Sequence, residues 1–243
     1  MRVGIIGLGN FGRFAAELLA RDKDLEVIAC DASDNGAPEG VKKVDLAEAA
    51  SADAVVLCVP LAAYGEVLSK LKPLLKKETL VVDICSVKVE PNKQLRQYLE
   101  GHENLLVTHP MFGPQSAANG TAGHVLVVTD AVGQRAQDTV EYCEHKLGLN
   151  IMRMTNEEHD KAMADVHALT FFVARGLHKI GLSKSPFQAP SYEMLLDLVA
   201  FDEKHSEELF QTIEQGNPYA ADARGQLLKA LTDVHNSLAT DKE

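Results

Sequence analysis

The sequence lacks any excess of basic residues, since 24 Lys and Arg stand against 35 Asp and Glu, for a net charge of −11. Both halves of the chain are acidic. Nucleic acids and anionic membrane surfaces attract basic proteins, so neither is expected as a partner. Long apolar runs are also missing, and none approaches the roughly 18 residues of a membrane span. Glycines interrupt the apolar residues 3–6 at once, so no signal peptide is predicted there.

Cysteine is scarce and follows no known pattern. Cys30, Cys58, Cys85 and Cys143 are separated by 28, 27 and 58 residues, which matches neither a zinc site nor a CxxC redox pair. We therefore expect buried apolar cysteines, no metal site and no disulfide framework. Together these absences favour a reducing compartment, and the cytoplasm is the expected location.

What the chain does have is a regular alternation of apolar strands and helical patterns over its first 150 or so residues. The strands are apolar without alternation, which is typical of parallel strands covered on both faces. We expect an α/β fold with a Rossmann-type doubly wound parallel sheet. A loop is expected at Asp34–Gly36. The expected strands are residues 3–6, 25–30, 54–59, 80–84, 105–107 and 124–129.

The pattern changes after Ile151, and no convincing strand follows Asn156. Helical spacing predicts three helices, at about 156–178, 191–214 and 220–238. The chain is therefore predicted to consist of an NAD-binding domain, residues 1–152, and a small all-α domain, residues 153–243. A bundle of about 90 residues has little core of its own, so we expect it to pack on the first domain or on a partner chain.

The segment Gly7-Leu8-Gly9-Asn10-Phe11-Gly12 follows a predicted strand and opens a predicted helix, the context that a dinucleotide-binding loop requires. The helix N-terminus would present free N–H groups to a pyrophosphate. Asp31 ends the next strand and would bind the ribose hydroxyls and repel a 2′-phosphate, and the next basic residue is Lys42. NAD is therefore the predicted cofactor. The alternatives are NADP and a glycine-rich turn without a ligand.

Further strand ends supply candidates for chemistry. Pro60 ends one strand and is predicted to form a wall near the cofactor, unless it only stops the strand. His109 follows another, and a histidine is the usual acceptor of the hydroxyl proton when a hydride leaves an alcohol carbon. Ser86 is predicted to hydrogen-bond the same hydroxyl or the carboxamide of the nicotinamide, or else to cap a helix. Lys88 is predicted to meet a substrate carboxylate, or else to lie in solvent.

Four segments, Gly7–Gly12, Asp83–Lys88, His109–Pro114 and Glu158–Ala164, occur in an order that resembles the prephenate/arogenate dehydrogenase family of tyrosine biosynthesis. The closest likeness is to the dehydrogenase half of bifunctional chorismate mutase–prephenate dehydrogenases. The resemblance runs along nearly the whole chain. It implies oxidation of the ring alcohol of prephenate or arogenate with NAD(P)+, the ring carboxylate leaving as CO₂.

The resemblance also implies roles for single residues. His109 matches the histidine that takes the proton of the ring hydroxyl, and Ser86 matches the serine that assists it. His159 and Asp160 match a His-Asp pair that opens the long helix, where an architectural role is expected. The helical domain is implied to form a homodimer.

The sequence departs from the family pattern where a substrate carboxylate is bound. Phe201 stands where the family has an arginine, and Glu193 stands where a second arginine is common. The long helix of the family often carries a histidine near position 171, but this chain has Phe171 there. One charge-assisted hydrogen bond contributes about 1.5–3 kcal/mol, so the loss matters for a dianionic substrate.

Three side chains are predicted as replacements at this point. Arg175 on the long helix, or Arg224 from a partner chain, would supply the charge, and His167 would supply a hydrogen bond, unless it is a partly buried helix histidine. The leading prediction is an NAD-dependent prephenate or arogenate dehydrogenase. The alternatives are a dehydrogenase of the same fold acting on a different cyclic or hydroxy acid, and a non-catalytic NAD-binding regulator.

Overall fold

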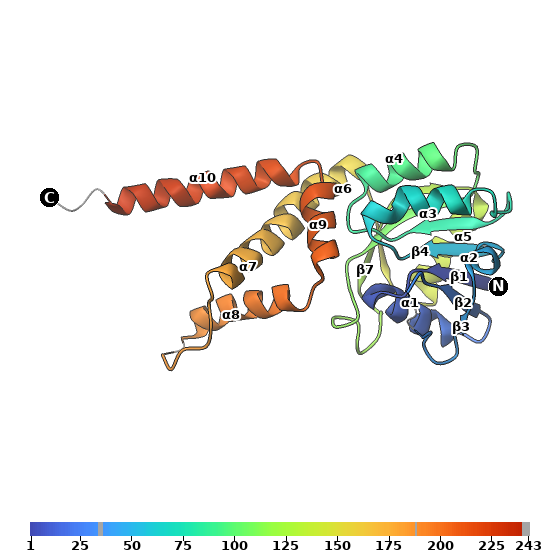
Figure 1. Ribbon diagram of the computed structural model, residues 1–243, viewed down its shortest axis with the longest axis horizontal. Coiled ribbons are helices and arrows are strands. Elements are labelled where there is room, and N and C mark those ends of the chain that lie inside the picture. The colour runs from blue at the N-terminus through green and yellow to red at the C-terminus, as the bar shows by residue number, and fades with distance from the viewer. Residues whose placement is uncertain (34–35, 188, 240–243) are drawn as a thin grey trace. The chain divides into compact units, whose positions relative to one another are not determined.

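The computed structural model describes residues 1–33, 36–187 and 189–239, so the predicted loop at Asp34–Gly36 lies mostly outside the described residues (Figure 1). The chain divides into two compact units, Met1–Asn156 and Glu157–Glu243. The division falls four residues after the predicted one, because a last strand extends the first unit. Among the described helices, none is both long enough and apolar enough to cross a membrane.

The first unit is an eight-stranded sheet in the order β3-β2-β1-β4-β5-β6-β7-β8. In chain order the strands are β1 (Arg2–Ile6), β2 (Glu26–Cys30), β3 (Lys42–Lys43), β4 (Ala54–Leu57), β5 (Leu80–Asp83), β6 (Leu105–Pro110), β7 (Val125–Val132) and β8 (Asn150–Arg153). The helices are α1 (Asn10–Ala20), α2 (Leu46–Ala50), α3 (Tyr64–Leu71), α4 (Val89–Tyr98) and α5 (Gln134–His145), with a 3₁₀ turn at Leu61–Ala63.

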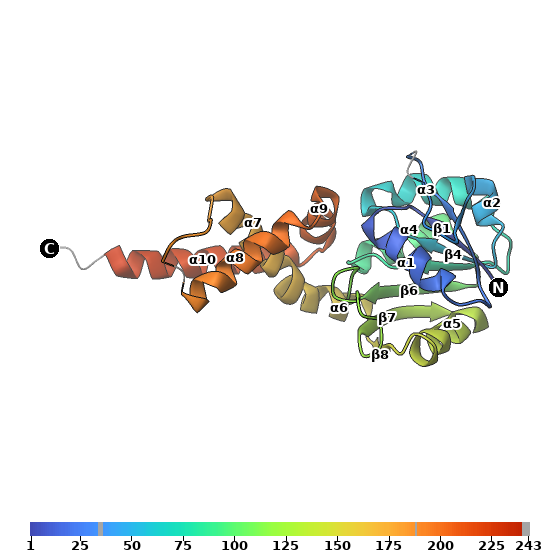
Figure 2. The ribbon, with the colours of Figure 1, turned by 90° about the horizontal axis from the view of Figure 1, so that it is seen from below.

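The sheet is covered on both faces because alternate residues of its strands are apolar on each side. In β1, Val3 and Ile5 pack in one cluster with Ala16 of α1, while Ile6 packs in another with Leu68 of α3. That second cluster also holds residues of α2 and α4, and a third cluster joins α5 to the strands from β4 to β7. Figure 2 shows the same helices around the strands from a second side. The predicted Rossmann-type fold class is confirmed.

One strand runs against the prediction of a parallel sheet. β7 pairs antiparallel with β6, and the residues between them, 111–124, contain no helix in this fully described segment. A parallel strand needs a crossover connection, usually a helix, so a chain without one returns antiparallel. Two further strands, β3 and β8, were not predicted, because both are short and mostly exposed and carry no apolar run.

The second unit consists of helices. They are α6 (Asn156–Met163), a π-helical turn η2 (Ala164–Ala168), α7 (Leu169–Lys179), α8 (Pro190–Glu203), α9 (Glu207–Gly216) and α10 (Ala220–Ala239). The second predicted helix is in fact two, because the Ser206 hydroxyl accepts a hydrogen bond from the Leu209 amide and begins α9 there. The core of this unit is built around Phe171 and Ile213.

Candidate active site

The carboxyl ends of β1, β2, β4 and β5 meet at one row of cross-strand partners, which continues to Val107 within β6. Cys30 of β2 pairs with Ile6 of β1, Ile6 with Leu57 of β4, Leu57 with Asp83 of β5, and Asp83 with Val107 of β6. In such sheets, ligands bind outside the carboxyl ends of the strands. Every cofactor or catalytic residue predicted for this unit follows a member of this row within six positions along the chain. The register therefore gathers them at one edge of the sheet.

The glycine loop is shaped by the strands beneath it. Gly7 has a φ of +100°, and a Cβ there would lie 2.4 Å from the Cys58 carbonyl oxygen. A Cβ on Gly12 would lie 2.0 Å from the carbonyl oxygen of Gly7. A Cβ on Gly9, by contrast, would meet no atom within 4 Å. The fold itself thus requires the first and third glycines, whereas the space in front of Gly9 is available to a ligand.

The N-terminus of α1 suits an anion. Gly9 caps the helix without a side chain, and the first turn of this fully described helix carries no acidic residue. The orphan N–H groups at the start of α1 therefore have no side-chain cap and no carboxylate within their own turn, and the helix dipole favours an anion there. Asn10 is exposed, and the ring of Phe11 contacts that of Phe14 edge-on at 5.7 Å between centroids. Pro60 is exposed at the end of the neighbouring β4 segment.

Asp31 is tied to the glycine loop. Its carboxylate accepts hydrogen bonds from the Leu8 amide at 2.5 Å and from the Ser33 amide at 2.7 Å, and also from the Ser33 hydroxyl. Burial alone would raise the pKa of Asp31, but these hydrogen bonds outweigh it and lower the pKa. The carboxylate is therefore ionised at neutral pH, as a group that binds ribose hydroxyls and repels a phosphate must be.

A buried polar cluster holds the end of β5. The carboxylate of Asp83 accepts hydrogen bonds from the Tyr64 hydroxyl, the Lys88 ammonium and the Cys85 amide. The Lys88 ammonium also donates to the Thr108 carbonyl at 2.5 Å, and its side chain is fully buried. The structure corrects the prediction that Lys88 meets a substrate carboxylate or lies in solvent, because its charge is taken up by a carboxylate inside the domain.

Burial, together with the negative charge of Asp83, raises the pKa of Tyr64 well above its ordinary value, so the phenol stays a hydrogen-bond donor at every working pH. Sequence reasoning missed Tyr64 and Thr108 as parts of this cluster. The available signal was Asp83, the polar residue that ends the apolar strand Leu80–Asp83. A carboxylate buried at such a position needs hydrogen-bond donors close by.

Ser86 and His109 lie on the two segments that the cluster joins. Ser86 is half-buried, three residues beyond Asp83. His109 is only 4% exposed and lies inside β6, where it pairs with Val127 of β7, so the prediction that it follows the strand is wrong. It does lie two residues beyond Val107, the last residue of β6 that pairs with β5. At His109, β6 is thus paired with β7, beyond the last residue that pairs with β5.

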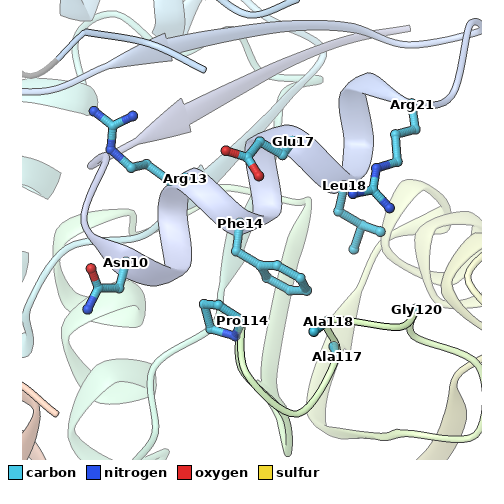
Figure 3. Close-up of a pocket in the computed structure, with 10 residues that line it drawn as sticks. All are labelled: Asn10, Arg13, Phe14, Glu17, Leu18, Arg21, Pro114, Ala117, Ala118 and Gly120. Atoms are coloured by element: carbon cyan, nitrogen blue, oxygen red, sulfur yellow. The ribbon is translucent and has the colours of Figure 1, made fainter. Parts of the chain in front are cut away.

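A surface pocket of about 330 Å³ lies between α1 and the segment 114–120 (Figure 3). In Figure 3 the ring of Phe14 points toward the part of this segment that carries Ala117 and Ala118. The pocket shares Asn10 with the glycine loop, but neither Ser86 nor His109 lines it, so it is separate from the row of strand ends. Its lining residues are Asn10, Arg13, Phe14, Glu17, Leu18, Arg21, Pro114, Ala117, Ala118 and Gly120.

In the helical unit, Arg175 joins three helices. Its Nε donates to both carboxylate oxygens of Asp202, at 2.8 and 2.9 Å, and a terminal nitrogen donates to Glu207 at 2.7 Å. The guanidinium also lies 4.0 Å from the ring centroid of Phe210. The prediction that Arg175 offers its charge to a substrate carboxylate is corrected, because two carboxylates of its own unit already occupy it. Arg224 likewise donates to Glu214.

Two of the three positions that depart from the family pattern, Phe171 and Phe201, form an aromatic core. Phe171 is fully buried, and its ring lies 4.8 Å from that of Phe201 and 5.1 Å from that of His205. His167, in the π-helical turn, lies edge-on to Phe171 at 5.0 Å. Burial lowers the pKa of His167 to about 4, so the imidazole is neutral at physiological pH. The apolar residues here are therefore part of what holds the helices together.

A doubly wound sheet, a glycine loop opening its first helix and an acidic residue at the end of β2 define a dinucleotide-binding domain. The sequence profile described as "Prephenate dehydrogenase, nucleotide-binding domain" matches residues 14–146, more than half of the chain. The chain belongs to this family, and the predicted resemblance is confirmed.

Individual relatives agree with this assignment. Arogenate dehydrogenase 2, chloroplastic, of Arabidopsis thaliana is 32% identical, over 98% of this chain and 70% of its own length. Arogenate dehydrogenase 1, chloroplastic, of the same plant is 31% identical, over 90% of this chain and 36% of its own length. The fold is shared with the crystal structure of prephenate dehydrogenase from A. aeolicus in complex with hydroxyphenyl propionate and NAD+, at a TM-score of 0.77 and 19% identity, covering 98% of this chain and 91% of that one.

Proposed function

We propose that this chain is an NAD-dependent dehydrogenase that oxidises prephenate or arogenate, with the ring carboxylate leaving as CO₂. The observation that carries the proposal is the row of paired strand ends, which brings the glycine loop, Asp31, Ser86 and His109 to one edge of the sheet. Family membership supplies the class of reaction.

The residues at this edge fit NAD. A pyrophosphate can approach the backbone at Gly9, where no side chain stands within 4 Å of a Cβ position, and it can accept N–H bonds from the start of α1. The ionised Asp31 suits the ribose hydroxyls and repels a 2′-phosphate. When bound here, NAD+ would supply the acceptor for the hydride that leaves the ring carbon carrying the hydroxyl.

In the proposed reaction His109 acts as the general base. The imidazole takes the hydroxyl proton as the hydride leaves, and Ser86 hydrogen-bonds the same oxygen. Loss of CO₂ then makes the ring aromatic, and the proton held by His109 returns to the phenol oxygen. General base catalysis of this kind typically contributes about 10²–10⁴-fold to the rate.

The experiment is a direct assay of the purified protein with NAD+ and either prephenate or arogenate, followed by the absorbance of NADH. We expect turnover with at least one substrate and a loss of about 10²–10⁴-fold in kcat for His109→Ala. His145→Ala, an exposed histidine at the end of α5, is the matched control and should keep full activity. Turnover with NADP+ in preference to NAD+ would contradict the cofactor assignment.

Two other outcomes correspond to the alternative functions. Binding of NAD+ without turnover of either compound, but with turnover of another cyclic or hydroxy acid, would indicate a dehydrogenase of different specificity. Binding of NAD+ with no turnover of any of these would indicate a regulator. Either result would contradict the proposed reaction.

We further propose that the helical unit forms a homodimer. The support is a line of exposed apolar side chains on α10, where Leu228, Leu231, Val234 and Leu238 are 51–76% exposed and recur every three or four residues. A stripe with that spacing occupies one face of a helix and gains stability when a second copy covers it. Leu231→Glu should shift the mass measured by light scattering from dimer to monomer, whereas Leu74→Glu in the first unit should not.

The proposed location is the cytoplasm, supported by the four cysteines, none of which forms a disulfide. Fractionation of the source cells tests this location, and recovery of the protein from an oxidising compartment or an organelle would contradict it.

A further inference from the structure

The ion pair between Asp83 and Lys88 has no part in binding or chemistry in the proposed reaction, yet both side chains are fully buried. Removing two charges from water costs several kcal/mol for each, and a pair of apolar side chains fills such a space at least as stably. Stability alone therefore does not account for this pair. Buried charges that persist without a gain in stability are best attested where they fix a geometry.

The geometry that this pair fixes is the junction of two strands. The Asp83 carboxylate accepts the Cys85 amide at 3.1 Å, which holds the start of the segment that carries Ser86. At the end of that segment, the Lys88 ammonium returns to Asp83 and also donates to the Thr108 carbonyl. The Thr108 hydroxyl in turn donates to the Asp83 carbonyl at 2.7 Å.

These contacts begin where the strand pairing stops. The register of β5 with β6 ends at Asp83 and Val107, and the register of β6 with β7 shifts between Val107 and Thr108. A shift of this kind leaves backbone groups outside the ladder and changes the direction of the side chains that follow. His109 is the first residue after this shift to which a catalytic role is assigned. The residue before it is Thr108, whose carbonyl accepts a hydrogen bond from the Lys88 ammonium.

We propose that Asp83 and Lys88 are positioning residues for the dehydrogenase reaction, holding the Ser86 segment and the His109 backbone in one register. Neither touches the substrate. This inference rests on the proposed function and adds two residues to its machinery. A displacement of about 1 Å in a catalytic group costs on the order of 10²-fold in rate, so the effect of losing the pair should be large in kcat and small in binding.

The first test removes both charges together, in the double variant Asp83→Asn with Lys88→Met, which leaves no unpaired charge in the core. The variant should fold, as judged by circular dichroism, and should bind NAD+ with unchanged affinity. Its kcat should fall about 100-fold while KM stays within about threefold. A folded double variant whose kcat lies within threefold of wild type would overturn the proposal.

The second test uses single substitutions that are safe for the fold. Thr108→Val removes one buried hydroxyl bond to a backbone carbonyl at the carboxyl end of β5. Thr79→Val is the matched control, because its buried hydroxyl makes the same kind of bond, to the Ala52 carbonyl at 3.1 Å, at the opposite end of β5. Both should lower the unfolding midpoint by similar amounts, but only Thr108→Val should reduce kcat, by about tenfold. Equal kcat values in the two variants would overturn the proposal.

The pH dependence gives a readout that a purely structural role leaves unchanged. In the wild type, kcat/KM should level off once His109 is neutral. In the double variant hydroxide replaces the misplaced imidazole, so kcat/KM should go on rising with pH beyond that point. A double variant with the wild-type profile would contradict the positioning role. The wild type is assayed first. If it turns over neither substrate, the proposed function is refuted, and this inference with it. If the wild type is active and the variants give the contradicting results stated above, only the positioning role is refuted.

Discussion

The glycine loop separates what the fold needs from what a ligand needs, and two alanine substitutions exploit that difference. In Gly12→Ala the new Cβ would lie 2.0 Å from the Gly7 carbonyl oxygen and 3.1 Å from the Cys58 Cβ. Backbone cannot rotate away as a side chain can, so we expect a cost near the upper end of the 1–3 kcal/mol typical of overpacking. In Gly9→Ala the Cβ enters open space, and the backbone, at φ −66° and ψ −172°, suits alanine.

The two variants should therefore fail in different assays. Gly12→Ala should lower the unfolding midpoint of the ligand-free protein by about 6–12 °C, which is about 3 kcal/mol at 2–4 °C per kcal/mol. Gly9→Ala should change it by less than about 4 °C, since the expected cost is within about 1 kcal/mol. Its NAD+ affinity should nevertheless fall by about 10- to 150-fold, the equivalent of one charge-assisted hydrogen bond of about 1.5–3 kcal/mol.

Thermal unfolding of the ligand-free variants and calorimetric titration with NAD+ measure the two effects. Wild-type NAD+ affinity in Gly9→Ala would contradict the assignment of that space to the cofactor. A ligand-free Gly12→Ala protein with the wild-type midpoint would contradict the claim that the fold requires this glycine.

Three further outcomes are expected. Asp31→Ala should lower the preference for NAD+ over NADP+ by at least about tenfold in kcat/KM, because one negative charge near the 2′ position is removed; an unchanged ratio would contradict this role. Phe171→Ala should cost about 3–5 kcal/mol in urea unfolding, since the ring is fully buried, and a loss below 1 kcal/mol would show that this core is loose. Burial holds the pKa of His167 at about 4 in the folded protein, whereas in the unfolded chain it is about 6.5. As pH falls, the unfolded chain therefore binds this proton first, so the stabilisation from a neutral His167 is fully present only above about pH 6.5. It should be lost by up to about 1.4 kcal/mol per pH unit as pH falls from 6.5 toward 4, and His167→Gln should abolish that slope in urea titrations.

Much of the fold could be predicted because continuous apolar runs mark buried strands wherever they occur. Such runs do not encode direction, which is why the strand predicted at residues 124–129, observed as the antiparallel β7, was expected to be one more parallel strand. The missing helix in residues 111–124 was the available clue, since a parallel return needs a crossover. Strands β3 and β8 are short and mostly exposed, and each pairs with the edge of the sheet, which local sequence does not show.

The parts of the candidate site that depend on the course of the backbone could be predicted from the sequence. The parts that depend on the direction in which a side chain points could not. The glycine loop and Asp31 follow from the strand-turn-helix context. Lys88 was assigned to solvent or to substrate because a long flexible stem has no direction in a sequence. Its inward turn depends on Asp83 and Thr108, which come together only after the strands pair. Arg175 was misjudged for the same reason, its carboxylate partners lying 27 and 32 residues further along the chain.

The row of paired strand ends separates positions where a substitution disturbs the core from positions where a substitution changes what the site binds. Residues before the row lie in the strands and are held by the core, whereas the residues that would meet a ligand follow it within a few positions. Substitutions beyond the row can alter which acid or which nucleotide is accepted without repacking the sheet. The Asp83–Lys88 pair limits that freedom, because it ties one such segment to the next strand, and new specificities should therefore arise more readily at the ends of β1, β2 and β4 than at those of β5 and β6.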